Sequence, residues 1–149
     1  MIGYPKEYVE SARGLARDLE KRLHNVFGMT KVRVMVVGLL CETDASHKKM
    51  ADMICAHMGM EPEAYTLKTR SRRIVELRWI ITRLIRQHYP TITLKNLGDM
   101  MGGMDHTTMT NNSQRAQDLL DANDKTFCEK YIKAVAAVEQ WLNEQYAQS

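Results

Sequence analysis

Residues 102–108 combine a glycine pair, an aspartate and a short polar run in the order Gly-Gly-Met-Asp-His-Thr-Thr. Two consecutive glycines favour a tight turn, and Asp105 can accept hydrogen bonds from the free N–H groups of a helix's first turn. The helix that begins there presents His106, Thr107 and Thr108, whose side chains can contact base edges or phosphates. The pattern predicts the turn and second helix of a helix-turn-helix that reads duplex DNA.

Positive charge gathers upstream of this motif, although the net charge of the chain is only +3. Residues 68–88 carry seven basic side chains against Glu76 alone, whereas residues 1–67 carry nine basic and nine acidic ones. The seven are Lys68, Arg70, Arg72, Arg73, Arg78, Arg83 and Arg86. Clustered arginines suit phosphate oxygens and predict salt-sensitive binding to a polyanion, although a solvated helix face has the same charge pattern. Arg70 lies just before a predicted helix, a position from which basic arms enter the minor groove.

Helical periodicity accounts for most of the chain. Apolar residues recur every three or four positions over six main stretches, and capping residues or glycines fall at their ends. We expect helices at residues 5–27, from 45 or 46 to 58, 72–89, 94–101, 105–120 and 126–142, with Thr93, Asp105 and Thr126 as caps and a short helix near Pro62. Residues 31–40 are rich in β-branched side chains, but no partner strand is recognisable, so we favour a buried helix there.

The first predicted helix has a narrow apolar stripe. Its members follow alternating steps of three and four residues: Val9, Ala12, Ala16, Leu19, Leu23 and Val26. This spacing fits packing against the helix's own domain, and it also fits pairing with a second copy of the chain in a homodimer. The stripe is too short to indicate a free-standing coiled coil, so both interpretations stay open.

Composition narrows the classes of function. With 149 residues and 44% hydrophobic content we expect one domain, or one domain with an appendage, and no apolar run is long enough to span a membrane. The N-terminus lacks the apolar core of a signal peptide, so we expect a cytoplasmic protein. Three widely spaced cysteines, an odd number, favour free thiols over a disulfide framework or a zinc site. We expect no metal and no cofactor, and no bound nucleotide because a GxxxxGK[ST] loop is absent.

An enzyme is the least favoured class. The chain offers too few convergent carboxylates for hydrolysis assisted by two metal ions. Asp105 and His106 are adjacent, but neighbouring residues of a helix point apart, which disfavours acid–base work by this pair. We therefore assign no catalytic residue.

Residues from about 43 to 138 resemble the C-terminal DNA-binding domain of DnaA, the bacterial replication initiator. The resemblance rests on Arg70-Ser71-Arg72, Arg78, Leu94-x-x-Leu97-Gly98 and Gly102-Gly103-x-Asp105-His106-Thr107-Thr108, the last being close to the family signature G-G-R-D-H-T-T. It implies an all-α domain with a helix-turn-helix related to that of the Trp repressor, which reads a short asymmetric site in duplex DNA. No ATPase motif accompanies it, so we expect a stand-alone DNA reader rather than an initiator.

The resemblance also implies roles for individual residues. Asp105, His106 and Thr107 match positions that face bases in the major groove, and Arg70 matches one that enters the minor groove. The residues at positions that meet the DNA backbone are Arg78, Arg86, Leu94 and Thr108. With Arg72 from the basic arm and Lys95, these residues form the expected DNA-binding set.

Four positions depart from the family pattern. Met104 replaces an arginine and removes a phosphate contact, and Lys95 replaces a proline that touches a thymine methyl group. Trp79 replaces a glutamine and Asn111 a histidine at positions that contact the backbone, although a tryptophan on a helix is more often a core residue. We therefore expect a target sequence different from that of the initiator.

Taken together, these patterns predict an all-α protein with an N-terminal helical extension at residues 1–42 and a DnaA-type DNA-binding domain at residues 43–149. Its expected partner is double-stranded DNA, which it would bind as a regulator or as a replication accessory factor. A protein-interaction module on the same fold, without specific DNA readout, is the alternative that Met104, Lys95 and the methionine-rich stretch at 50–60 favour.

Overall fold

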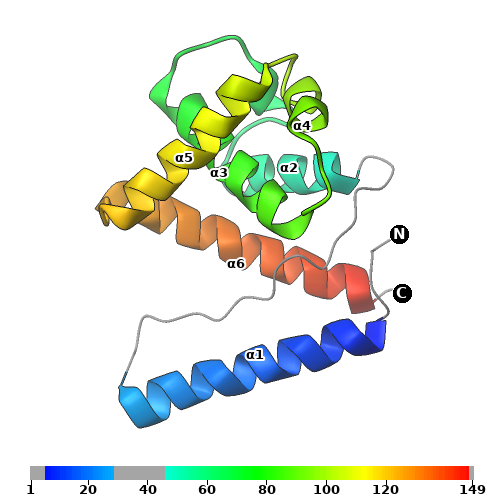
Figure 1. Ribbon diagram of the computed structural model, residues 1–149, viewed down its shortest axis with the longest axis vertical. Coiled ribbons are helices and arrows are strands. Elements are labelled where there is room, and N and C mark those ends of the chain that lie inside the picture. Colours follow the sequence, from blue (N-terminus) through cyan, green and yellow to red (C-terminus); the bar gives the residue numbers. More distant parts are fainter. Residues whose placement is uncertain (1–5, 29–45, 148–149) are drawn as a thin grey trace.

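The computed structural model describes residues 6–28 and 46–147, and the regular elements in these two ranges are all helices (Figure 1). They are α1 (Lys6–Phe27), α2 (Ser46–His57), the 3-10 helix η1 (Ala64–Thr66), α3 (Arg72–His88), α4 (Leu94–Met100), α5 (His106–Asp121) and α6 (Lys125–Ala147). The predicted all-α class is confirmed, and each of the six α-helices begins within two residues of its expected start. The helix expected over residues 31–40 lies outside the described residues. None of the helices described is both long and apolar enough to cross a membrane.

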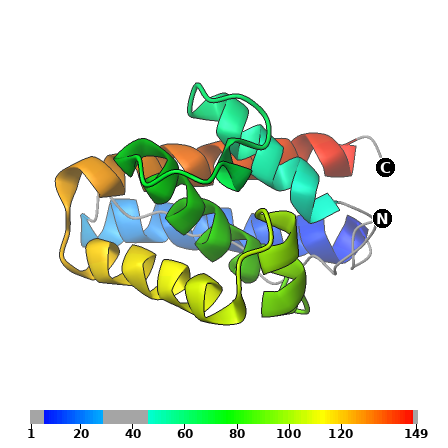
Figure 2. The same cartoon turned by 90° about the horizontal axis from the view of Figure 1, so that it is seen from above.

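Helix α3 runs through the middle of the fold, packed against α2, α5 and α6 (Figure 2). Its buried face is the one that the periodicity predicts, with Leu77, Ile81, Leu84 and Ile85 fully buried and Ile74 half-buried. The fully buried side chains that surround it include Met50, Ile54, Tyr65, Leu97, Met101, Met109 and Phe127. Because α3 is enclosed by the other helices, it forms the scaffold on which α4, α5 and the loop before α3 are held.

The caps expected at α4 and α5 are confirmed. The Asp105 carboxylate accepts a hydrogen bond from the Thr108 N–H at 2.8 Å, and the Thr93 hydroxyl oxygen accepts one from the Asn96 N–H at 3.0 Å. Each side chain satisfies an N–H group that has no partner within its own helix. The start of each helix is therefore fixed by a residue that is identifiable in the sequence.

The cap of α6 differs from the prediction. The Asp124 carboxylate accepts a hydrogen bond from the Phe127 N–H at 2.9 Å, and Thr126 lies inside the helix. Both Asp and Thr are good capping residues, so local sequence did not separate the two choices. The correction moves the cap and the start of the helix two residues upstream.

Glycines shape the turn between α4 and α5, and two of them, Gly98 and Gly102, leave little space for a side chain. Gly102 and Gly103 have φ values of +96° and +82°, a left-handed conformation that other residues adopt only with strain. A Cβ atom on Gly98 would lie 2.0 Å from the Met104 carbonyl oxygen, and the Gly98 carbonyl oxygen accepts hydrogen bonds from the Gly103 and Met104 N–H groups. A Cβ atom on Gly102 would lie 3.1 Å from the Thr66 carbonyl oxygen. The turn is therefore packed directly against α4 and against η1.

Helix α1 lies at the end of the molecule opposite to the start of α5 (Figure 1). Part of its predicted apolar stripe is half-buried, namely Ala12, Ala16 and Leu23. Leu19 and Val26 are instead 49% and 70% exposed, and the side chain of Val9 lies outside the described set. The predicted stripe is therefore divided between a face that packs on the domain and a face that is open to solvent.

His88 titrates abnormally because the fold buries it. It lies in the last turn of α3, is 1% exposed, and feels the charge of Arg13 on α1. Burial, with a smaller contribution from Arg13, lowers the pKa of His88 from 6.5 to about 4. Between these two values the unfolded chain binds a proton that the folded protein excludes, so stability is complete above pH 6.5 and falls as the pH decreases. We expect this group to lower the free energy of unfolding, measured in urea, by about 2 kcal/mol at pH 5 relative to pH 7.5.

The control for this pH dependence is an exposed histidine on another helix. His88→Gln is expected to remove most of the difference between pH 5 and pH 7.5, whereas the same change at His57 is expected to leave it intact. The readout is the slope of the free energy of unfolding against pH, because this slope does not change if the substitution lowers stability equally at every pH. An equal slope in wild type and His88→Gln would contradict the assignment.

Candidate DNA interface

Two segments that are distant in sequence meet at one end of the molecule. The loop that leads from η1 into α3 and the start of α5 both lie at the top of Figure 1, and Gly102 in the turn before α5 packs against Thr66 in η1. The loop contains Lys68 and Arg70, both exposed. The fold therefore brings the predicted basic arm next to the predicted recognition helix.

The first turn of α5 presents polar side chains to solvent. Asp105, His106 and Thr107 are exposed and Thr108 is half-buried, whereas Met109 is fully buried and anchors the helix to the core. Hydrogen bonds from the backbone and side chain of Thr108 lower the pKa of Asp105, so its carboxylate is ionised at neutral pH. The tip of α5 can thus enter a groove without exposing any of the core.

Arg72 is held in place by the helix it begins. Its Nε donates to the Glu76 carboxylate, which is also 2.8 Å from Lys130 Nζ, and its guanidinium lies 5.6 Å from the centre of the Trp79 ring. Burial alone would raise the pKa of Glu76, but hydrogen bonds from Lys130 and Arg72 outweigh it and lower the pKa. Arg72 remains largely exposed beyond this contact, so it presents a fixed cation beside the arm.

Arg78 occupies a different environment from the one that the resemblance implied. It is 8% exposed, its Nε donates to the Tyr65 carbonyl at 2.9 Å, its Nη1 donates to the Thr69 carbonyl at 3.1 Å, and its Nη2 donates to the Leu67 carbonyl. Burial lowers the pKa of Arg78, and these three carbonyls compensate part of the cost of burying its charge. Arg78 is therefore a positioning residue that fixes the backbone of the arm, rather than an exposed ligand for phosphate.

The other expected contacts come from two elements that pack against α5. On α3, Arg86 is exposed and its Nη1 donates to the Ser113 hydroxyl oxygen of α5 at 3.1 Å, beside a surface groove between the two helices. On α4, Lys95 is exposed and Leu94 is half-buried against the core. Arg86 and Lys95 therefore offer positive charge on helices that pack against α5.

Trp79 is a core residue, as the more usual interpretation of a helical tryptophan predicts. It is 9% exposed, and its ring meets Phe127 edge to face with centroids 6.4 Å apart. The guanidinium groups of Arg72 and Arg115 each lie 5.6 Å from its centroid. Trp79, at a position where the related family has glutamine, thus stabilises the packing of α3 against α5 and α6 in this chain.

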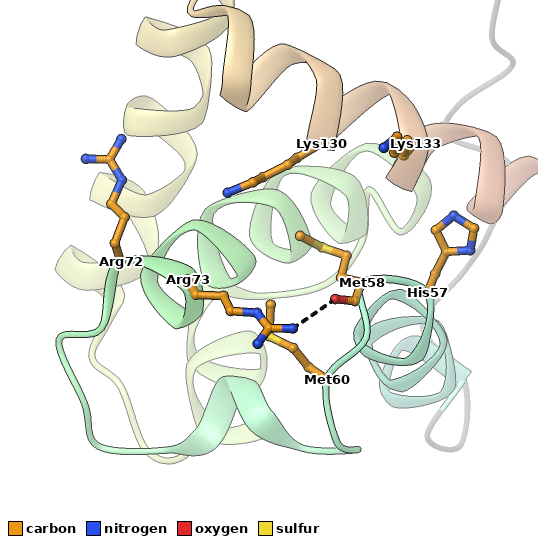
Figure 3. A pocket seen from close by; sticks show the side chains of 7 residues that line it. All are labelled: His57, Met58, Met60, Arg72, Arg73, Lys130 and Lys133. Carbon is orange, nitrogen blue, oxygen red and sulfur yellow. Dashed lines mark hydrogen bonds between the residues drawn. The ribbon is translucent and has the colours of Figure 1, made fainter.

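A second group of cations, which joins two arginines of the basic run to lysines that the sequence did not single out, lies between α2, α3 and α6 (Figure 3). A pocket of about 510 Å³ is lined by His57, Met58, Met60, Arg72, Arg73, Lys130 and Lys133. The Nη2 atom of Arg73 donates to the carbonyl groups of Met58 and Gly59 at 3.4 and 3.2 Å, which fixes its guanidinium at the pocket wall. Local charge patterns identified the arginines of α3, but only the fold shows that two lysines of α6 extend the same basic surface.

Comparisons with known proteins agree with this arrangement. Residues 47–115 match the family model described as bacterial dnaA protein helix-turn-helix. The chain is 31% identical over 70 residues, 47% of its length, to the chromosomal replication initiator protein DnaA of Synechococcus sp. (strain JA-2-3B'a(2-13)). It is 28% identical over 82 residues, 55% of its length, to the protein of the same name in Thermus thermophilus. The chain spans 15% and 19% of these two relatives, and no solved structure matches it significantly.

The matched segment coincides with the elements that build the candidate interface. It begins in α2 and ends in α5, so it includes the arm, α3, α4, the glycine turn and the capped start of α5. The resemblance read from the sequence is confirmed over this segment. Over residues 47–115, the chain is therefore similar to the helix-turn-helix domain of bacterial DnaA proteins.

Proposed function

We propose that this protein binds a specific sequence of double-stranded DNA, reading the major groove with the first turn of α5 and the minor groove with Arg70. One observation carries the proposal: the exposed tip of α5 and the basic arm lie at the same end of the molecule, joined by the contact between Gly102 and Thr66. A helix tip in the major groove places an adjacent arm within reach of the neighbouring minor groove. Neither segment alone would make this pair of contacts.

The side chains at the tip suit base edges. His106 can donate a hydrogen bond to N7 of a purine, and the methyl group of Thr107 can contact that of a thymine. Asp105 can accept from the amino group of a cytosine, because a carboxylate has acceptor capacity beyond the one bond that caps the helix. These three side chains supply the sequence preference in the proposal.

Positive charge around the tip supplies affinity without sequence preference. Arg72, Arg86 and Lys95 are exposed on helices next to the arm and α5, and the pocket of Figure 3 adds Arg73 and the two lysines of α6. Contacts of this kind release counterions, so binding is expected to weaken steeply as salt increases. The matched relatives are chromosomal replication initiators, and we infer that this protein acts as a replication accessory factor or as a transcription regulator.

Selection from a pool of random duplexes tests the proposal directly. The protein is expected to enrich one short asymmetric sequence, and binding to that sequence is expected to exceed binding to unselected duplexes at every salt concentration. Enrichment of no sequence would refute specific readout. That result would instead favour the alternative, a protein-interaction module. The observation in favour of this alternative is Met104, which is half-buried against the core at a position where the related family has a phosphate-contacting arginine.

Arg86→Ala separates phosphate contacts from base contacts. Because Arg86 is exposed on α3 beside α5, we expect the variant to bind the selected duplex and a scrambled duplex with equally reduced affinity. Its plot of log affinity against log salt should be shallower by about one unit, since one phosphate contact is lost. Fluorescence anisotropy at several salt concentrations measures both quantities, and a loss confined to the selected sequence would contradict this role.

A further inference from the structure

The outward face of α1 carries an exposed apolar stripe. Tyr8, Leu15, Leu19 and Val26 are 67%, 71%, 49% and 70% exposed. At about 100° of rotation per residue, these four side chains fall within a sector of about 40° on the helix surface. Arg13, which is half-buried and interacts with His88, points to a different side of the helix. Helix α1 thus has one face against the domain and a second, apolar face directed to solvent, and such continuous patches mark interaction surfaces.

We propose that a second copy of this chain covers the stripe, with the two α1 helices packed antiparallel about a two-fold axis. The steps between the four residues are seven, four and seven, which is the same series in both directions along the helix. Antiparallel pairing therefore places Leu15 opposite Leu19 and Tyr8 opposite Val26 of the second copy. Every contact then occurs twice, as a two-fold interface requires.

Charge favours the antiparallel over the parallel arrangement. Arg22 lies about 20° beyond one edge of this sector, so parallel pairing would place it level with its own copy at the border of the interface. Antiparallel pairing places it level with the small Ala12 of the second copy, about five residues along the axis from the exposed Glu7 of that copy, which lies on the same flank of the stripe as Arg22. The symmetric spacing and this charge complementarity favour a second copy of the chain over a partner of unrelated sequence.

Such a dimer has a consequence for DNA, which rests on the proposed function. The stripe is on the helix farthest from the start of α5, so two-fold pairing through α1 directs the two DNA-reading ends away from each other (Figure 1). The dimer would then hold two separate duplex segments, rather than two adjacent half-sites on one face of one duplex.

Analytical ultracentrifugation of the whole chain tests the pairing without DNA. A short two-helix interface is expected to be weak, so the mass should rise from the 17.2 kDa monomer toward the dimer over roughly 1–500 μM. Leu15→Glu is expected to keep the protein monomeric over this range. Arg17→Glu is the matched control, because Arg17 is exposed on the opposite side of the same helix. A monomeric wild type throughout, or equal behaviour of the two variants, would overturn the proposal.

Disulfide trapping tests the direction of pairing. In a Cys41→Ser, Cys128→Ser background, mixing Leu15→Cys with Leu19→Cys protein of different tag length is expected to give mainly the mixed dimer, because position 15 faces position 19 and neither position faces its own copy. Parallel pairing would instead give mainly Leu15→Cys or Leu19→Cys homodimers, and so would overturn the antiparallel arrangement. A wild type that dimerises but selects no DNA sequence would refute the proposed function alone, since neither measurement here involves DNA.

Discussion

Replacing Gly98 by alanine is expected to lower the free energy of unfolding by roughly 3 kcal/mol. DNA binding by the variant is expected to be lost at temperatures near the variant's melting temperature. The reason is geometric: a Cβ atom at this position would lie 2.0 Å from the backbone carbonyl oxygen of Met104, which cannot rotate away as a side chain would. Relieving that clash requires α4 to move from the turn, and both hydrogen bonds that the Gly98 carbonyl accepts from the turn would be strained or lost. Urea unfolding followed by circular dichroism measures the change.

Gly14→Ala is the matched control for this effect. Gly14 is also inside a helix, but a Cβ atom there would meet no heavy atom within 4 Å. Alanine is the better helix former, so we expect this variant to be as stable as wild type or more stable by up to about 1 kcal/mol. If Gly98→Ala were as stable as Gly14→Ala, the close approach of α4 to the turn would be wrong.

The second large effect is expected at the tip of α5, where His106→Ala should lower affinity for the selected duplex by roughly 5- to 150-fold, equivalent to about 1–3 kcal/mol. His106 is exposed and takes no part in capping α5, so the variant should retain the wild-type free energy of unfolding. Binding to a scrambled duplex should change little, because a base contact contributes mainly to the selected sequence. Arg70→Ala is expected to lower affinity for the selected duplex by a similar factor. The sequence preference should be relaxed at the base pairs nearest the proposed minor-groove contact.

Two comparisons make this result interpretable. His57→Ala removes an exposed histidine from α2, away from the tip of α5, and is expected to leave sequence preference unchanged. Repeating the duplex selection with His106→Ala should relax the preference at one or two adjacent positions. Unchanged affinity and an unchanged selected sequence would show that this helix does not read bases.

The position of the interface follows partly from signals that are local in sequence. Asp105 and Thr93 are capping residue types placed directly before apolar periodic stretches, and both cap the helices as expected. Gly102 and Gly103 adopt the left-handed conformation that a tight turn needs. Such features depend on atoms a few residues apart, so residue types alone determine them.

The roles of charged side chains depended on their surroundings. Arg78 and Arg86 are indistinguishable as members of a basic run, yet the first is buried against three carbonyl groups and the second is exposed beside α5. Lys130 and Lys133 gave no signal in sequence, because the arginines that line the pocket with them lie on another helix. Burial and proximity across helices are properties of the packed chain, and no local pattern encodes them.

By itself, then, the sequence determined the helices, their caps, the glycine turn and the exposed polar tip of α5, because each follows from residue types and spacings within a few turns of backbone. Only the tertiary structure decided that the arm and this tip share one end of the molecule, that Arg78 supports the arm from inside, and that α1 leaves an apolar stripe in solvent. Those outcomes depend on how α2, α5 and α6 pack around α3. Such packing joins segments that are distant in the chain, so it cannot be read from neighbouring residues.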